Sequence, residues 1–200
     1  MGQYYKPVIL GEKTEENHET VKAWMCSHEY GDGLKLMEHS YQGNNFVSTF
    51  EKQLSRKGDY YKSRVVWAGD YADEEPGLKI INEGKEYDAN LYSLSNDKNE
   101  IKPKVSKTNT YPYILNHTKK LFVDKNKVPE IKDWKGAKIH PLPLLTCEGC
   151  FRGGGDYSVN SPDANLVGSW ARDVISVEKT NPLVTTDTMD YKELIVSFCE

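Results

Sequence analysis

The apolar residues of this 200-residue chain occur in short runs separated by turn-forming residues, and one stretch repeats them at helical spacing. In that stretch Phe46, Phe50 and Leu54 fall on one face, after a pair of asparagines that can cap a helix. The pattern predicts one main helix near residues 45–57. The clearest of the other runs is 62–69 (KSRVVWAG), whose β-branched and aromatic residues are typical of a strand.

These features predict an α+β fold with a mostly antiparallel sheet and one main helix, in a single domain over residues 1–200. Residues 77–109 are polar without a stable apolar face, so we expect a surface excursion there, with a short strand at 78–81 and a short helix or strand at 90–94. Residues 140–157 are rich in Pro and Gly and predict a shaped loop. Further strands are expected at 3–10, 111–117, 119–124, 166–177 and 194–198.

Charge and cysteine content limit the classes of function. Lys and Arg number 26 against 30 Asp and Glu, a formal charge of -4 that disfavours a globally basic nucleic-acid binder. The first residues lack a secretory signal pattern, and the apolar runs are too short for a membrane helix, so we expect a cytoplasmic protein with no membrane partner. In that compartment four cysteines indicate reduced thiols rather than a disulfide framework.

The basic residues are strongly skewed, since 22 are Lys and four are Arg. The four arginines are Arg56, Arg64, Arg152 and Arg172, and the last three border segments rich in Gly, Trp or Asp. We therefore expect a site near those three. The alternative is that they form a structural network with neighbouring aspartates.

A glycine-rich segment forms the first candidate site, with Arg152 before three glycines that can bring backbone N–H groups close to a phosphate or carboxylate. The segment fits neither a Walker A loop nor a dinucleotide-binding fingerprint. The alternative is a tight connection without a ligand. The residues of this segment are Arg152, Gly153, Gly154, Gly155, Asp156 and Tyr157.

A second candidate pairs Trp170 with Arg172, which would share one face of the expected 166–177 strand. An aromatic ring beside a guanidinium can stack a base or hold a peptide. The alternative places Trp170 in the core, with Arg172 reaching Asp70 or Asp156.

A third candidate is acidic. Asp70, Asp73 and Asp156 could hold a divalent metal, with Arg152 stabilising charge on a phosphoester substrate, but no dedicated metal spacing is present. The alternative is a solvated acidic turn.

Cys147 and Cys150 have the spacing of a zinc half-site or a redox pair. Zinc would need further ligands from Cys26 and His28, or from His140. Such a pair is weak evidence by itself, and we expect no cofactor and no metal.

Several segments together resemble a group of uncharacterised proteins of bacteria and their phages: MGQYYK at the start, GDGLKL at 31–36, VWAGDYAD at 66–73, RGGGDY at 152–157 and VGSW at 167–170. The resemblance implies a phage or mobile-element protein, for which binding and inhibiting a host defence system is a common task. It carries no known activity.

The sequence thus favours a non-catalytic binding protein whose target is a host protein or a small nucleotide-like anion. The competing hypothesis is a metal-dependent phosphoester hydrolase that uses the clustered aspartates. The predicted ligand-binding residues are Arg64, Asp70, Arg152, Gly153, Gly154, Gly155, Asp156, Tyr157, Trp170 and Arg172.

Overall fold

The computed structural model describes residues 2–96, 98–102, 111–152 and 163–198. Its strands are β1 (Tyr5–Leu10), β2 (Val21–Trp24), β3 (Ser63–Gly69), β4 (Lys79–Asn82), β5 (Lys85–Asp88), β6 (Asn99–Glu100), β7 (Tyr113–Asn116), β8 (Leu121–Asp124), β9 (Cys147–Glu148), β10 (Val174–Glu178) and β11 (Lys192–Glu193). The α-helices are α1 (Leu36–His39), α2 (Asn45–Gln53), α3 (Leu91–Leu94) and α4 (Pro141–Thr146). The 3₁₀ helices are η1 (Ser27–Tyr30), η2 (Lys125–Lys127), η3 (Cys150–Arg152), η4 (Ala164–Leu166) and η5 (Pro182–Val184).

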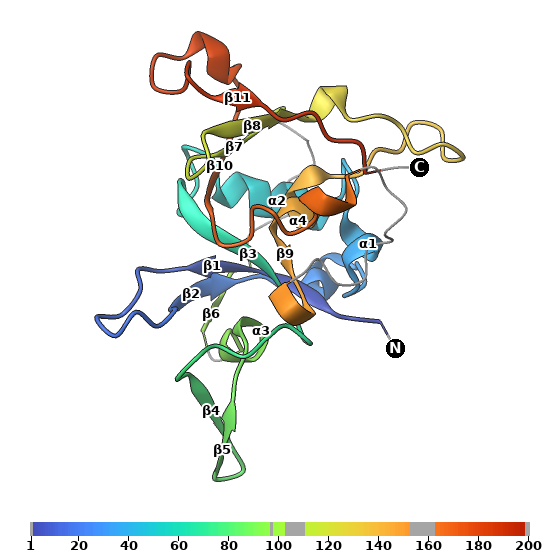
Figure 1. Cartoon of the computed structure of the whole chain (residues 1–200). Helices are drawn as coiled ribbons and strands as arrows, with labels where there is room; N and C mark the ends of the chain where they lie inside the picture. The colour runs from blue at the N-terminus through green and yellow to red at the C-terminus, as the bar shows by residue number, and fades with distance from the viewer. Residues whose placement is uncertain (1, 97, 103–110, 153–162, 199–200) are drawn as a thin grey trace.

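One large sheet organises the molecule, in the strand order β11-β8-β7-β10-β3-β1-β2-β6, with β9 also paired to β3 (Figure 1). The central pairs β7/β10, β10/β3, β3/β1 and β1/β2 are antiparallel, while β11, β6 and β9 join in parallel. The predicted fold class, α+β with a mostly antiparallel sheet, is therefore confirmed.

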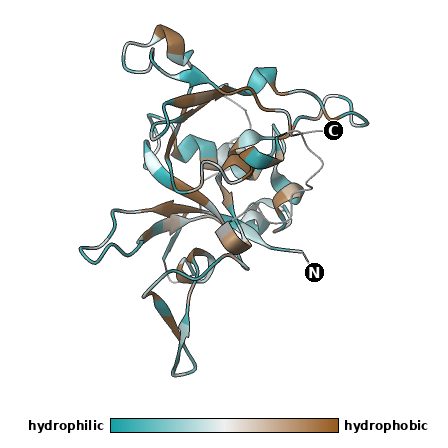
Figure 2. Cartoon of the chain, viewed as in Figure 1, coloured by the Kyte–Doolittle hydropathy of each residue, from teal (hydrophilic) through white to brown (hydrophobic). Residues whose placement is uncertain are grey.

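The side chains of strand β3 point alternately to the two faces of the sheet, so this strand contributes to the packing on both faces. Val65 and Trp67 belong to the main core cluster, which also holds residues of α2 and α4, whereas Val66 and Ala68 pack with Leu91 of α3. Figure 2 shows the hydrophobic residues concentrated on the strands and on α4 in the middle of the molecule. Two layers of helices thus enclose the centre of the sheet.

Helix α2 begins as expected, because the Asn44 side chain accepts a hydrogen bond from the Val47 N–H at 3.0 Å. Phe46, Phe50 and Leu54 are fully buried. The helix ends at Gln53 rather than near residue 57, since the chain turns over the next residues and Tyr60 N–H donates to the Gln53 carbonyl.

Charged and titratable groups are buried beside this helix. Glu51 of α2 accepts two hydrogen bonds from Lys125 at 2.6 and 2.8 Å, and lies 3.2 Å from His140 Nε2. Elsewhere Trp67 donates to His39 Nε2 at 2.9 Å. Burial lowers the pKa of His39 to about 4, so this ring is neutral at pH 7.

Within the 140–157 segment, the described residues 140–152 include a helix where a loop was expected. Residues 141–146 form α4, because proline is well accommodated in the first turn of a helix and the His140 side chain accepts from the Leu142 N–H. The expected strand over 166–177 is also shorter, since residues 167–173 form turns and β10 starts at Val174. No strand covers 194–198.

The 77–109 segment combines exposed and buried parts. Strands β4 and β5 form a hairpin that projects from the body and whose residues are almost all exposed (Figure 1). Ala89 and Leu91 are buried, and β6 pairs with β2. Residues 97 and 103–110 lie outside the described residues. Across the described part of the chain, no helix combines the length and the apolar character needed to cross a bilayer.

Candidate functional site: an arginine–glutamate network and an acidic–aromatic face

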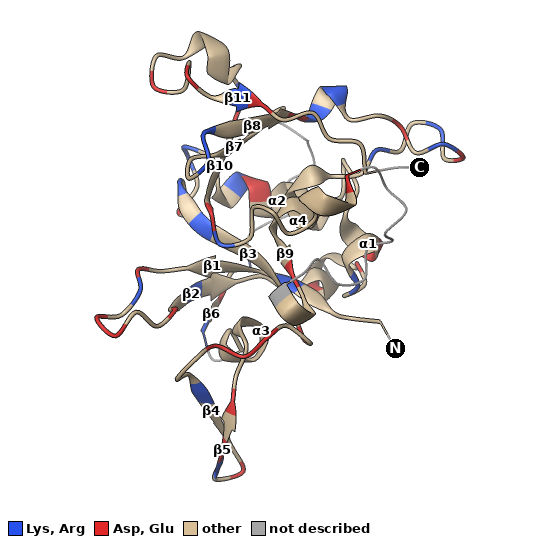
Figure 3. Cartoon of the chain, viewed as in Figure 1, with Lys and Arg blue, Asp and Glu red and all other residues tan. Residues whose placement is uncertain are grey.

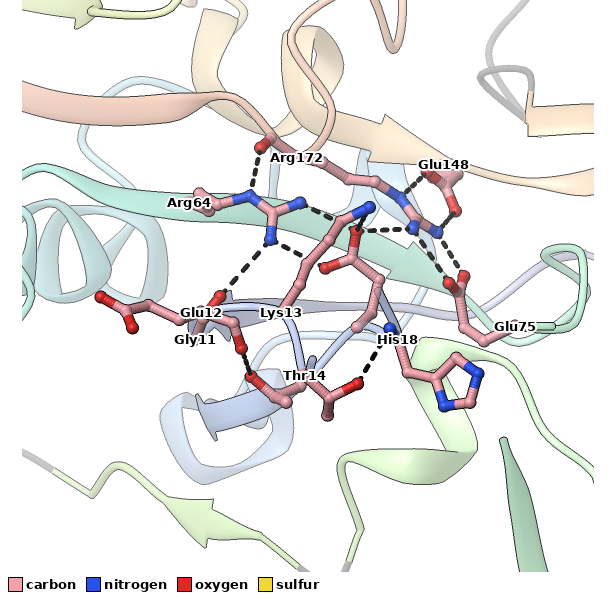
Figure 4. Close-up of polar contacts among 11 residues, drawn as sticks. Gly11, Glu12, Lys13, Thr14, His18, Arg64, Glu75, Glu148 and Arg172 are labelled. Atoms are coloured by element: carbon pink, nitrogen blue, oxygen red, sulfur yellow. Dashed lines mark hydrogen bonds and ion pairs between the residues drawn. The ribbon is translucent and has the colours of Figure 1, made fainter. Parts of the chain in front are cut away.

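The Arg172 side chain lies at the centre of a cluster of glutamate carboxylates (Figure 4). Its Nε and Nη2 donate to the two oxygens of Glu148 at 2.8 and 2.6 Å. Nη1 and Nη2 donate to the two oxygens of Glu75, the former at 3.0 Å, and Nη1 also lies 3.4 Å from Glu19. All three nitrogens are thus engaged by carboxylates.

The Arg172 backbone is unusual as well. It has a φ of 69°, in the left-handed region, and its N–H donates to the Val65 carbonyl at 2.7 Å. A non-glycine residue pays a conformational cost there. The contacts of its side chain and backbone hold it in place.

Arg64 joins the same cluster from β3. Its Nη1 and Nη2 each donate to one oxygen of Glu19 at 2.8 Å, and its Nε donates to the Arg172 carbonyl at 3.2 Å. Glu19 therefore bridges the two arginines. We call Glu19, Arg64, Glu75, Glu148 and Arg172 the arginine–glutamate network.

The network lines a cleft of about 710 Å³ together with Lys13 and His18. Its three glutamate side chains are 4–5% exposed. Two arginines against three glutamates leave one negative charge, which Lys13 balances from the solvent side, 3.4 Å from Glu19. The charges on the cleft floor are thus largely paired among themselves.

The electrostatics of Glu19 follow from this pairing. Burial alone would raise its pKa, but the hydrogen bonds and charge of Arg64, with the charges of Arg172 and Lys13, lower it below its ordinary value. Burial likewise opposes the charge on Arg172, and hydrogen bonds to Glu148 and Glu75 outweigh it and raise the pKa. Both groups are charged at pH 7.

The structure brings only some of the predicted site residues together. Arg64 and Arg172 meet, and the carboxylates that Arg172 contacts among the described residues belong to glutamates and not to Asp70, while Asp156 lies outside the described residues. Trp170 is 1% exposed in the main core, so it presents no ring to a ligand beside Arg172. The shared strand face expected for Trp170 and Arg172 is wrong, because both lie in turns.

The glycine-rich segment falls mostly outside the described residues. Gly153, Gly154, Gly155, Asp156 and Tyr157 belong to 153–162, and Arg152 ends η3. Their role in binding stays a prediction.

Of the three aspartates in the competing metal hypothesis, Asp70 and Asp73 accept hydrogen bonds from backbone N–H groups, and Asp156 lies outside the described residues. Asp70 accepts from the Tyr4 N–H at 2.9 Å, and Asp73 accepts from the Phe151 N–H at 2.9 Å. Among the described residues, no three His, Cys, Asp or Glu side chains are grouped so as to bind a metal ion. The hydrolase hypothesis gains no support from this geometry.

The two cysteines of the CxxC pair have different surroundings. Cys147 is buried and its thiol donates to the Leu144 carbonyl, whereas Cys150 is exposed and donates to the Tyr71 carbonyl. Burial raises the pKa of Cys147 to about 12, which opposes the thiolate that zinc binding and redox chemistry require. His140, one possible zinc ligand, is buried against Glu51.

A second surface combines exposed rings with carboxylates. The hydrogen bonds of Asp70 and Asp73 tie Tyr4 and Phe151 to the loop after β3, and Tyr71 lies between the two aspartates. Phe151 is 96% exposed, and Tyr4 and Tyr71 are about half exposed.

This surface continues to the base of the β4–β5 hairpin. A cleft of about 450 Å³ there is lined by Asp70, Glu74, Asp88 and Tyr87, among others, and by no Lys or Arg. Figure 3 shows acidic residues along the segment that leads into β4. We call the following set the acidic–aromatic face: Tyr4, Asp70, Tyr71, Asp73, Glu74, Tyr87, Asp88 and Phe151.

Sequence reasoning included Asp70 but missed the rings and the glutamates of the network. Gly-Asp-Tyr at 69–71 marks the strand end, yet nothing local shows that Tyr4 and Phe151 arrive beside it. Comparisons of the chain with protein-family models, curated proteins and solved structures gave no match.

Proposed function

We propose that this protein is a non-catalytic binding protein that docks its acidic–aromatic face onto a basic surface of a partner protein. The observation that carries the proposal is the set of exposed aromatic rings beside carboxylates that form no ion pair with any described Lys or Arg. Aromatic side chains dominate the energy of protein interfaces, and complementary charge steers association. Phe151, at 96% exposure, is the leading anchor.

The local geometry supports a preformed surface. The backbone of Phe151 is fixed by Asp73, and Cys150 Sγ is fixed by the Tyr71 carbonyl at 3.1 Å. Asn90 donates to the carbonyls of Asp70 and Ala72, which ties the hairpin base to the same loop. Because the backbone that carries the rings is held in this way, binding has to order only the side chains.

The cleft lined by the arginine–glutamate network is a weaker candidate for the binding surface, because both of its arginines are already engaged by carboxylates. Inhibition of a host defence protein by a phage-encoded binder, which the sequence resemblance implies, is a narrower form of the proposed function and stays a prediction.

Affinity capture with matched variants tests the proposal. Wild-type protein and a Trp134→Ala control, which removes an exposed ring elsewhere, should retain the same partner from a bacterial lysate. A Tyr71→Ala/Phe151→Ala variant should lose it, since each anchor removed costs about 2 kcal/mol or more. Retention of the same proteins by the double variant would refute the proposed face.

Salt dependence then tests the charge. With the captured partner purified, the affinity of wild type should fall as salt rises, and Glu74→Gln/Asp88→Asn should weaken this dependence. Binding that is insensitive to both salt and this variant would exclude a basic partner surface.

A further inference from the structure

A third surface, built around Arg56, differs from both sites above because basic residues are in excess. A cleft of about 310 Å³ opens between the end of α2 and the end of β10. Three cations and one carboxylate line it, so its formal charge is +2, against -3 for the cleft at the hairpin base. Its lining residues are Ser55, Arg56, Lys57, Tyr111, Val177, Glu178, Lys179 and Thr180.

The Arg56 guanidinium is held from one side. Its Nε donates to Glu178 at 3.0 Å, and the other Glu178 oxygen accepts from the Tyr61 hydroxyl at 2.8 Å. The guanidinium also lies over the Tyr61 ring at 5.3 Å. Its four Nη N–H donors have no hydrogen-bond partner within the described part of the chain.

The neighbouring lysines have spare donors too. Neither Lys57 nor Lys179 makes a hydrogen bond or ion pair with any described residue. The Lys179 ammonium lies 5.8 Å from the centre of the Tyr111 ring, and Tyr111 is one of the residues that line the cleft. Glu178 is engaged by Arg56 and Tyr61. The cleft therefore offers cationic donors and one aromatic surface.

We propose that this cleft binds a nucleoside phosphate, with the phosphate at Arg56, Lys57 and Lys179 and the base against Tyr111. Guanidinium and ammonium groups are the usual protein ligands of phosphate, and a base stacks on an aromatic ring. The volume lies at the lower end of small-molecule sites, which suits a mononucleotide.

The opposite side of Arg56 explains the placement of the anion. A second cleft of about 330 Å³ shares Arg56, Glu178 and Thr180 but is lined by Asp187. That carboxylate repels a phosphate, so the anion belongs on the Tyr111 side. The site is independent of the acidic–aromatic face and of the partner proposed for it.

Calorimetry with adenosine monophosphate as the probe tests the proposal, with inorganic phosphate and adenosine as separate titrants. The nucleotide should bind, and each fragment should bind at least about tenfold more weakly, since each lacks one of the two contacts. Absence of heat with the nucleotide at about 5 mM, or equal affinity for inorganic phosphate, would overturn the assignment.

Variants locate the site. Lys57→Ala/Lys179→Ala should weaken nucleotide binding by about tenfold or more, while a Lys85→Ala/Lys132→Ala control with the same charge change should leave it unaltered. Tyr111→Ala should abolish the preference for the nucleotide over inorganic phosphate. Equal losses in the two lysine pairs, or a preserved preference in Tyr111→Ala, would show that the ligand binds elsewhere.

Discussion

Arg172 and Arg56 are the same residue type in opposite surroundings. The three nitrogens of Arg172 make five hydrogen bonds to buried glutamates, whereas the Arg56 side chain donates to one described residue, Glu178, through Nε alone. Arg172 is mostly buried, and the Arg56 side chain is 58% exposed. The first arginine therefore supports the fold, and the second has donors left for a ligand.

The comparison predicts its largest effect for Arg172→Met, which keeps the aliphatic bulk and removes the charge. Glu75 and Glu148 would remain buried without their main cation, so unfolding free energy should fall by about 3–5 kcal/mol at pH 7. Urea unfolding followed by circular dichroism measures it. A loss below about 1 kcal/mol would show that the network is not structural.

Arg64→Met should have an intermediate effect of about 2 kcal/mol at pH 7, because Glu19 keeps the charges of Arg172 and Lys13. The folded pKa of Glu19 lies below its ordinary 4.5 in wild type, so the stability it confers is present above pH 4.5 and is lost as the pH falls below that value. The difference in unfolding free energy between wild type and Arg64→Met should therefore narrow as the pH falls below 4.5.

Both proteins should also lose stability between pH 6.5 and 4, because burial lowers the pKa of His39 and His117 to about 4 while the unfolded residues accept protons near 6.5. This loss is common to wild type and Arg64→Met, so the difference between their unfolding curves isolates Glu19. A difference in unfolding free energy that widens on acidification would contradict the stabilising role given to ionised Glu19.

The smallest effect is expected for Arg56→Met. Its ion pair with Glu178 is solvent-exposed on the arginine side, so the unfolding free energy should change by at most about 1 kcal/mol. The same urea assay measures it, which makes Arg56→Met the matched partner of Arg172→Met. A loss as large as that of Arg172→Met would erase the distinction between the two arginines.

Local sequence signals predicted much of the fold. The helical spacing of apolar residues predicted the buried face of α2, which is formed by Phe46, Phe50 and Leu54. The β-branched run at 62–69 predicted β3. Both patterns follow from which side chains are buried, so they can be recognised in the sequence. The sequence does not predict helix α4, because Pro141 and Pro143 favour a loop in most contexts, although proline is compatible with a first helical turn.

The candidate sites were less predictable, for a physical reason. Arg64 and Arg172 stood out in the sequence, but Glu19, Glu75 and Glu148 look like any solvated carboxylate until the fold buries them. Long-range pairing of this kind has no local period. Arg56 has no local signal that separates it from an ordinary surface arginine, because what distinguishes it is its unused donors, which only the fold reveals.

The Arg172–Glu19 contact joins residues 153 positions apart in the chain. We expect this contact to be absent from the folding transition state, because closing so long a loop is costly before the intervening chain has assembled. Interactions formed after that point mainly slow unfolding. Arg172 would then set how long a folded molecule persists before it opens, more than how quickly the chain reaches its native state.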